Sequence, residues 1–196
     1  VVSREDPGFN FNQARFRPGR DGMIYFWSAS MGDYSVALRV RPDGTDKAGG
    51  HIVYAVSNVA ANKDGIIASA NGHFAHKIAL YKKDFSLYAE CNDFMVGDSV
   101  GYDAPSWVEA GEGGDFYGAD THRSRILRIN PSGKIVTVCA VAPEPQNSKG
   151  VQEFRICEKK ESIYVLPANG AFRCVGFDGK IKWTANVNIH GGGWPI

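Results

Sequence analysis

The sequence predicts an all-β fold built from four copies of one four-stranded antiparallel unit. The first observation is a cassette of two short apolar runs and two turns that recurs along the 196 residues, with a period of about 45 residues. The second is that no segment keeps the apolar spacing of an amphipathic helix over three turns. A period of this size is typical of a β-propeller, in which each four-stranded sheet forms one blade.

The stretch from Gly114 to Val136 is the clearest copy of the cassette. Its two apolar runs, 116–119 and 126–129, are separated by a polar loop, and a turn over 130–133 follows the second run. Weaker copies cover 21–45, 64–86 and 161–183. With the strand before each cassette and the strand after it, the chain divides into repeats. The predicted repeats are 9–56, 57–104, 105–150 and 151–187, within one unit spanning 1–196.

The turns of the four copies fall at matching places. The turns before the first apolar run are centred on Gly22, Gly65, Gly114 and Glu161. Those after the second run are centred on Gly44, Phe85, Gly133 and Gly179. Glycine and Asp-Gly or Ser-Gly pairs are typical of hairpin turns. Each copy should therefore be a meander of strands.

Period-2 alternation supports strands on either side of these turns. Val36, Leu38 and Val40 alternate with smaller or polar residues, so they should lie on the blade face that packs on a neighbouring blade. The fourth strand of the first copy is expected at 51–56, after the Gly-Gly pair at 49–50.

Charge and hydropathy exclude two classes of partner. The net charge is +1, and no Lys/Arg cluster is longer than two residues, so the basic stripe of a nucleic-acid binder is absent from the sequence. No apolar run reaches the ~18 residues of a membrane-spanning helix, and no span is expected. The sequence does not determine the cellular compartment, and an extracellular or periplasmic location is slightly favoured.

The four cysteines do not form a recognisable metal or haem motif. Cys91, Cys139, Cys157 and Cys174 are too widely spaced for a zinc knuckle. Small buried thiols are the expected state. One disulfide is the alternative if the protein is exported.

Two copies resemble known propeller repeats. Ala119-Asp120, Arg125-Ile126 and Pro131-Ser132-Gly133 resemble the NHL-type repeat, and the same motif is similar to those of strictosidine-synthase-like and gluconolactonase-like six-bladed propellers. The stretch CVGFDGKIKWTANV, at 174–187, is similar to the quinoprotein-type repeat, whose family usually has eight blades. The resemblance implies a ring of six to eight blades. Because this chain supplies about four, it should be part of a larger ring, completed by a protein partner, a second copy or further sequence.

One set of candidate site residues lies in the loops between the second and third strands. By family analogy, these loops surround the mouth of the central channel, where propellers usually bind ligands. The candidates are His73, His76, Asp120 and His122. Imidazole is both a metal ligand and a proton carrier near neutral pH, so a metal or acid–base site is one interpretation. The alternative is solvated loop residues, with Asp120 capping its own loop.

A second set lies on the first strand of each copy, which should line the channel. Its members are Gln13, Asn58, Glu109 and Glu153. Gluconolactonase-like enzymes hold a divalent cation with Glu, Asn and Asp side chains, so the resemblance implies a Ca²⁺ or Zn²⁺ site built from these oxygens. The alternative is a polar lining around water.

The sequence favours a binding or scaffold module and leaves enzymatic activity open. It contains no Gly-x-Ser-x-Gly elbow, Walker loop or His-Glu-x-x-His motif. The alternative function is a propeller enzyme with its site at the channel mouth, of the metal-dependent hydrolase, lactonase or quinoprotein dehydrogenase type. A weaker interpretation is a carbohydrate-binding protein that uses exposed Trp27 and Trp107. The four tryptophans are otherwise expected to pack between blades.

Overall fold

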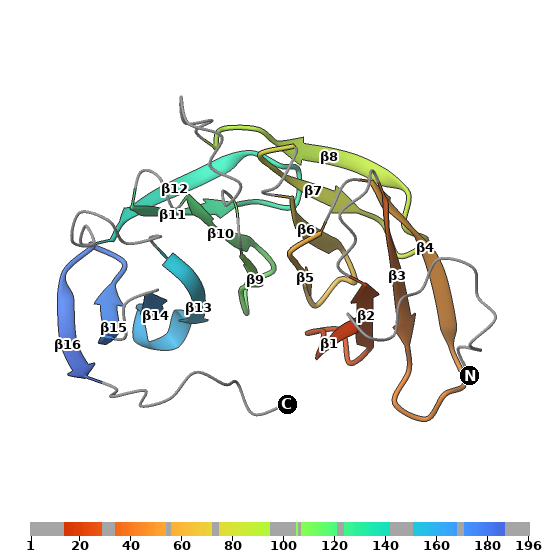
Figure 1. Ribbon diagram of the computed structural model, residues 1–196, viewed down its shortest axis with the longest axis horizontal. Coiled ribbons are helices and arrows are strands. Elements are labelled where there is room, and N and C mark those ends of the chain that lie inside the picture. The colour runs from red at the N-terminus through yellow and green to blue at the C-terminus, as the bar shows by residue number, and fades with distance from the viewer. Residues whose placement is uncertain are drawn as a thin grey trace.

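The computed structural model shows four separate antiparallel sheets arranged side by side along an arc (Figure 1). It describes residues 14–28, 34–53, 56–71, 75–94, 105, 107–120, 124–141, 151–167 and 171–186. Each sheet has four strands in the order of the sequence. The prediction of four four-stranded antiparallel blades is therefore confirmed. In Figure 1 the first strand of each sheet lies toward the concave side of the arc, and the last strand lies on the outer rim.

The blades are named by their order along the chain. Blade 1 comprises β1 (Ala14–Pro18), β2 (Ile24–Ser28), β3 (Tyr34–Val40) and β4 (Lys47–Val53). Blade 2 comprises β5 (Asn58–Ala61), β6 (Ile67–Asn71), β7 (Lys77–Tyr81) and β8 (Leu87–Cys91). Blade 3 comprises β9 (Val108–Ala110), β10 (Phe116–Asp120), β11 (Arg125–Ile129) and β12 (Ile135–Ala140). Blade 4 comprises β13 (Val151–Cys157), β14 (Ser162–Pro167), β15 (Ala171–Gly176) and β16 (Ile181–Asn186).

Helix is almost absent from the described residues, as the sequence predicts. The single helical element within those ranges is a three-residue 3-10 turn, Glu158–Lys160, between β13 and β14. None of the described segments forms a helix with the length and apolar character that a membrane crossing needs.

The aligned turns share one backbone conformation. All eight turn residues matched in the sequence have positive φ, including the two that are not glycine, Glu161 at 45° and Phe85 at 64°. In the turns after the third strands, the side-chain oxygen of one residue accepts the backbone N–H two residues later. These residues are Asp43, Asp84, Asn130 and Asp178, with distances of 2.9 to 3.1 Å. This shared local chemistry explains why the repeat is visible in the sequence.

The apolar core is divided among the interfaces between successive blades. One cluster joins blades 1 and 2, a second joins blades 2 and 3, and a third joins blades 3 and 4. Gly118 of β10 is required by this packing, because a Cβ atom there would overlap the Ile78 side chain of blade 2. Trp27 belongs to the first cluster and Trp107 packs against the third, which confirms that these tryptophans pack between blades.

The predicted position of the last strand in blade 1 is wrong by several residues. The strand is Lys47–Val53, because the preceding turn is closed tightly by the hydrogen bond from Arg41 N to Asp46 O, of 2.8 Å. Gly49 and Gly50, which precede the predicted strand, lie inside the observed one. Their missing side chains leave room for Leu38 of the same blade and Phe85 of blade 2.

The predicted packing of the apolar face of β3 on a neighbouring blade is not seen among the described residues. Blade 2 packs on the face that carries Ala37, while Val36, Leu38 and Val40 lie on the opposite, half-buried face at the end of the arc.

All four cysteines are free thiols. Cys91, Cys139 and Cys174 are buried and Cys157 is partly buried, so burial is confirmed for three of them. Burial raises the pKa of the Cys91 and Cys139 thiols.

Candidate functional site

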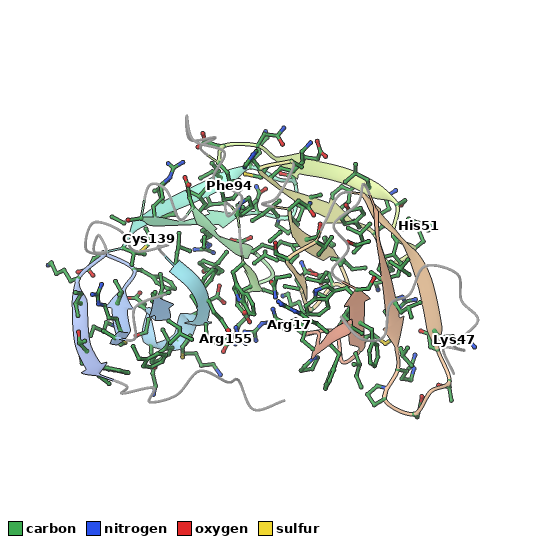
Figure 2. The ribbon with its side chains drawn as sticks, in the orientation of Figure 1. Arg17, Lys47, His51, Phe94, Cys139 and Arg155 are labelled. Carbon is green, nitrogen blue, oxygen red and sulfur yellow. The ribbon has the colours of Figure 1, made fainter. Side chains whose placement is uncertain are left out.

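The first strands of the blades gather polar side chains on the concave side of the arc. Figure 2 shows Arg17, from β1, and Arg155, from β13, both on this side although they come from opposite ends of the chain. Between them lie β5 and β9, and β9 contacts both β5 and β13. The strands that the sequence assigns to the channel therefore meet around one space.

Glu109, on β9, is the centre of this polar cluster. Its side chain is buried, and Arg17 Nη2 lies 2.6 Å from Oε1. Arg155 Nη1 and Trp107 Nε1 each donate to Oε2 at 3.4 Å. A buried carboxylate needs such partners, because removing an ion from water costs several kcal/mol unless charge and hydrogen bonds compensate.

The two arginines also fix the strands relative to one another. Arg17 Nη1 donates to the carbonyls of Val59 and Val108, both at 3.3 Å, so one guanidinium links β1, β5 and β9. Arg155 pairs with Glu153 at 2.8 Å, and its guanidinium lies 5.0 Å from the centre of the Trp107 ring. That distance is within the range of a cation–π contact.

A pocket of about 330 Å³ opens beside this cluster. Its walls combine three arginines, three aromatic rings, one amide and one small residue. They are Ala14, Arg15, Phe16, Arg17, Trp27, Asn58, Trp107 and Arg155.

Two side chains in the pocket wall have hydrogen-bond donors without an acceptor. Asn58 is fully buried, and its Oδ1 accepts the Val108 N–H at 3.0 Å, while its Nδ2 has no partner among the described residues. Trp27 is 3% exposed, and its Nε1 also has none. Buried donors normally find partners, so this wall has unused capacity to donate hydrogen bonds.

The structure brings together three of the four residues predicted to hold a cation. Asn58, Glu109 and Glu153 lie on successive first strands, while Gln13 lies outside the described residues. Arg155 forms ion pairs with both carboxylates, and Arg17 forms an ion pair with Glu109. Within the described ranges, no three His, Cys, Asp or Glu residues form a group that could hold a metal ion. The cation site stays a prediction.

Of the four candidates predicted in the loops between the second and third strands, the structure describes two. His73 and His122 lie outside the described residues, and His76, with a φ of 48°, immediately precedes β7. Asp120 is fully buried and accepts a hydrogen bond from Arg125 Nε at 2.8 Å. Since Arg125 also donates to the Asp93 carbonyl at 2.9 Å, this pair ties blade 3 to the segment that follows blade 2.

The arginines are the site residues that the sequence reasoning missed. Arg15 and Arg17 alternate on β1, and Arg155 occupies β13. The sequence feature that could have indicated them is the recurrence of arginine on first strands, at positions expected to line the channel. The suggestion that Trp27 is an exposed sugar platform is wrong, because its ring is buried between blades 1 and 2.

No family model and no curated protein matches the chain. Solved structures do match. One is a putative 6-phosphogluconolactonase from Bacteroides uniformis, with 15% identity and a TM-score of 0.64, covering 89% of this chain and 57% of that one. Another is catalytically inactive virginiamycin B lyase from Staphylococcus aureus with quinupristin, with 14% identity and a TM-score of 0.60, covering 88% and 55%.

A third is the β-propeller domain of Cps50 (Swd1) from Myceliophteria thermophila, with 12% identity and a TM-score of 0.58, covering 89% of this chain and 55% of that one. The chain thus spans a little over half the length of these structures. At such low identity the likeness speaks for the architecture alone. Together with the four sheets, it shows that this chain has the β-propeller fold.

Proposed function

We propose that the chain is a four-blade part of a larger β-propeller ring, acting as a binding module with its ligand site on the inner strands. The observation that carries this proposal is the exposure, at both ends of the arc, of positions that are buried in every interface between blades.

The face of each blade that meets the preceding blade has an apolar residue near the start of its second strand. Ile67, Phe116 and Ile163 occupy this place in blades 2, 3 and 4, and all are fully buried. Ile24 occupies it in blade 1 and is only half-buried.

The cross-strand partners of these residues repeat the contrast. Tyr81, Ile129 and Val175 are fully buried, whereas Val40 is half-buried. Phe16, which packs on Phe26 with ring centres 5.8 Å apart, is 70% exposed on the same face. A preceding blade would bury this surface as the other blades are buried.

At the opposite end of the arc, the outer face of blade 4 also carries residues that are less buried than their equivalents in the other blades. Tyr25, Ala68 and Tyr117 face the following blade and are buried, while Tyr164 takes their place in blade 4 and is half-buried. It packs with Phe172 and Trp183, with ring centres 5.6 to 6.3 Å apart. Trp183 is 45% exposed, so three aromatic rings lie on a surface without a neighbour in the described chain.

The occupant that fits both end faces is another four-stranded blade. Both faces continue the geometry of interfaces already formed within the chain, and burying each large apolar side chain contributes about 1.5–3 kcal/mol. Such interfaces are apolar sheet faces packed on one another. The missing blades can belong to a second copy, another chain or further sequence of this one, and the measured mass of the assembly separates these cases.

The test is the assembly state of the chain by native mass spectrometry and sedimentation, with and without a charge on an end face. We expect association through the end faces, and we expect Trp183→Asp to abolish it while the fold is kept. Thr184→Asp, on the opposite face of β16, is the matched control and should leave association unchanged. A monomer whose unfolding free energy is lowered by Trp183→Asp would contradict the proposal, because Trp183 would then be part of a finished core.

The second candidate function is a metal-dependent propeller enzyme. The observation in its favour is the convergence of Asn58, Glu109 and Glu153 on adjacent inner strands beside one pocket. Calorimetric titration with Ca²⁺ and Zn²⁺, repeated on Glu109→Gln, tests it. Binding that is lost in the variant would support the enzyme, and absence of binding would leave the binding module.

A further inference from the structure

We infer that the inner-strand pocket binds a small organic anion carrying a flat apolar group, such as an aromatic carboxylate or phosphate. The inference rests on the proposed function in one respect, that the inner strands are the ligand face. It specifies the chemistry of the ligand.

The charge of the pocket wall is the first argument. Among the described residues, three arginines line the pocket and no acidic residue does. Arg17 and Arg155 both pair with Glu109, and Arg155 also pairs with Glu153. Arg15 has no carboxylate partner among the described residues, and its one hydrogen bond is a 3.5 Å contact with the Ser57 carbonyl. One positive charge at the pocket therefore has no counter-charge within the described ranges.

The geometry of arginine suits this role. A guanidinium offers a planar fork of N–H groups that matches a carboxylate or phosphate with two parallel hydrogen bonds. Arg15 is exposed and pairs with no carboxylate of the described residues, so it can bind an anion without giving up an ion pair to any of them. Arg17 and Arg155 are held by their glutamates and define the adjacent wall.

The unused donors are the second, independent argument. Asn58 Nδ2 and Trp27 Nε1 have no acceptor in the described part of the chain, although both residues line the pocket and both are more than nine-tenths buried. A buried N–H without a partner is unfavourable. Because both nitrogen atoms are buried, a ligand oxygen would have to insert between the side chains of this wall to supply the acceptor that the described residues do not.

The rings and the volume define the rest of the ligand. Phe16 and Trp107 offer apolar surface beside the arginines, and flat groups stack well on such rings. A pocket of about 330 Å³ is at the small end of small-molecule sites. It suits a single ring with one acidic group. The chain's net charge of +1 gives no general attraction to polyanions, so selectivity must come from this local wall.

The experiment is calorimetric titration of the full chain with benzoate, phenyl phosphate, inorganic phosphate and uncharged benzyl alcohol, with tryptophan fluorescence as a second readout. We expect benzoate or phenyl phosphate to bind, and the preferred one to identify the acidic group. Benzyl alcohol and inorganic phosphate, which lack the charge or the ring, should bind at least tenfold more weakly.

Arg15→Gln should weaken binding of the preferred anion about tenfold, in line with the loss of one charged hydrogen-bonding group. Arg41→Gln is the matched control, an arginine that pairs with exposed Asp46 at 3.7 Å and lies outside the pocket. It should leave the affinity unchanged. Circular dichroism confirms that each variant is folded.

Three results would overturn the inference: no binding by the folded chain at millimolar concentrations, equal binding of benzyl alcohol, or equal affinity in Arg15→Gln. Failure here and failure of the ring proposal are separate results, because the assembly mass reports on the end faces and these titrations report on the pocket.

Discussion

Replacing Arg17 with methionine should destabilise the fold strongly. Methionine keeps the apolar stem of the side chain and removes its charge and donors. The change deletes the 2.6 Å ion pair with Glu109 and the two 3.3 Å hydrogen bonds to the carbonyls of β5 and β9. Among the contacts of the described residues, Glu109, with a side chain 8% exposed, then keeps the 3.4 Å contacts from Arg155 and Trp107.

The expected loss in unfolding free energy is about 3–5 kcal/mol, the cost of leaving a buried charge without its partner. The double variant Arg17→Met with Glu109→Gln should recover more than half of it, because the unpaired charge is then gone. Arg41→Met is the matched control. Its pair with Asp46 is 3.7 Å long and exposed, so it should cost at most about 1 kcal/mol.

The assay is urea unfolding at pH 7, followed by tryptophan fluorescence and circular dichroism. Strong positive coupling in the double-mutant cycle is the signature of a buried pair. A loss below about 1 kcal/mol for Arg17→Met, or strictly additive effects in the double variant, would refute the reasoning, since Glu109 would then not depend on Arg17.

Three further predictions concern single positions. Glu161→Gly should raise the unfolding free energy by about 0.5–1 kcal/mol, because the left-handed backbone at Glu161 costs an ordinary residue about 1–2 kcal/mol; Glu161→Ala should show no such gain in the same urea titration. Gly118→Ala should lower it by about 1–3 kcal/mol through overlap with Ile78, and pairing it with Ile78→Val should return part of the loss. Burial and the 2.8 Å hydrogen bond to Glu158 raise the pKa of Tyr117. The unfolded chain therefore loses this proton first, and stability should fall as the pH rises above about 10. Tyr117→Phe should flatten that decline between pH 9 and 11, and an unchanged slope would contradict the assignment.

The repeat could be predicted from the sequence because it is a local property. A turn that needs positive φ selects glycine, and an Asp or Asn before it closes the turn through its own side chain. Glu161 and Phe85 break the glycine rule but keep the backbone conformation. Phe85 is retained for packing, since its ring is buried between blades 1 and 2. The alignment of turns therefore located even the atypical members.

The site could be predicted only in part, because its contacts join distant segments. Strand position placed Asn58, Glu109 and Glu153 on the channel side. It could not show that Arg17 reaches Glu109 across two blades, because that depends on the curvature of the arc. A carboxylate at such a position suits a cation when it is unpaired, and suits a structural ion pair when an arginine lies within reach. Residue type alone does not separate the two.

The two proposals meet at one residue. Phe16 belongs to the end face of blade 1, where it packs on Phe26, and it also lines the pocket. A preceding blade that covered Phe16 would place a new wall beside Arg15. A ligand already stacked there would in turn change the surface offered to that blade. Linkage makes such an effect reciprocal, so whatever ring completion adds to ligand affinity, the ligand adds equally to ring completion. Binding on the inner strands and assembly at the end faces are therefore expected to be coupled in free energy.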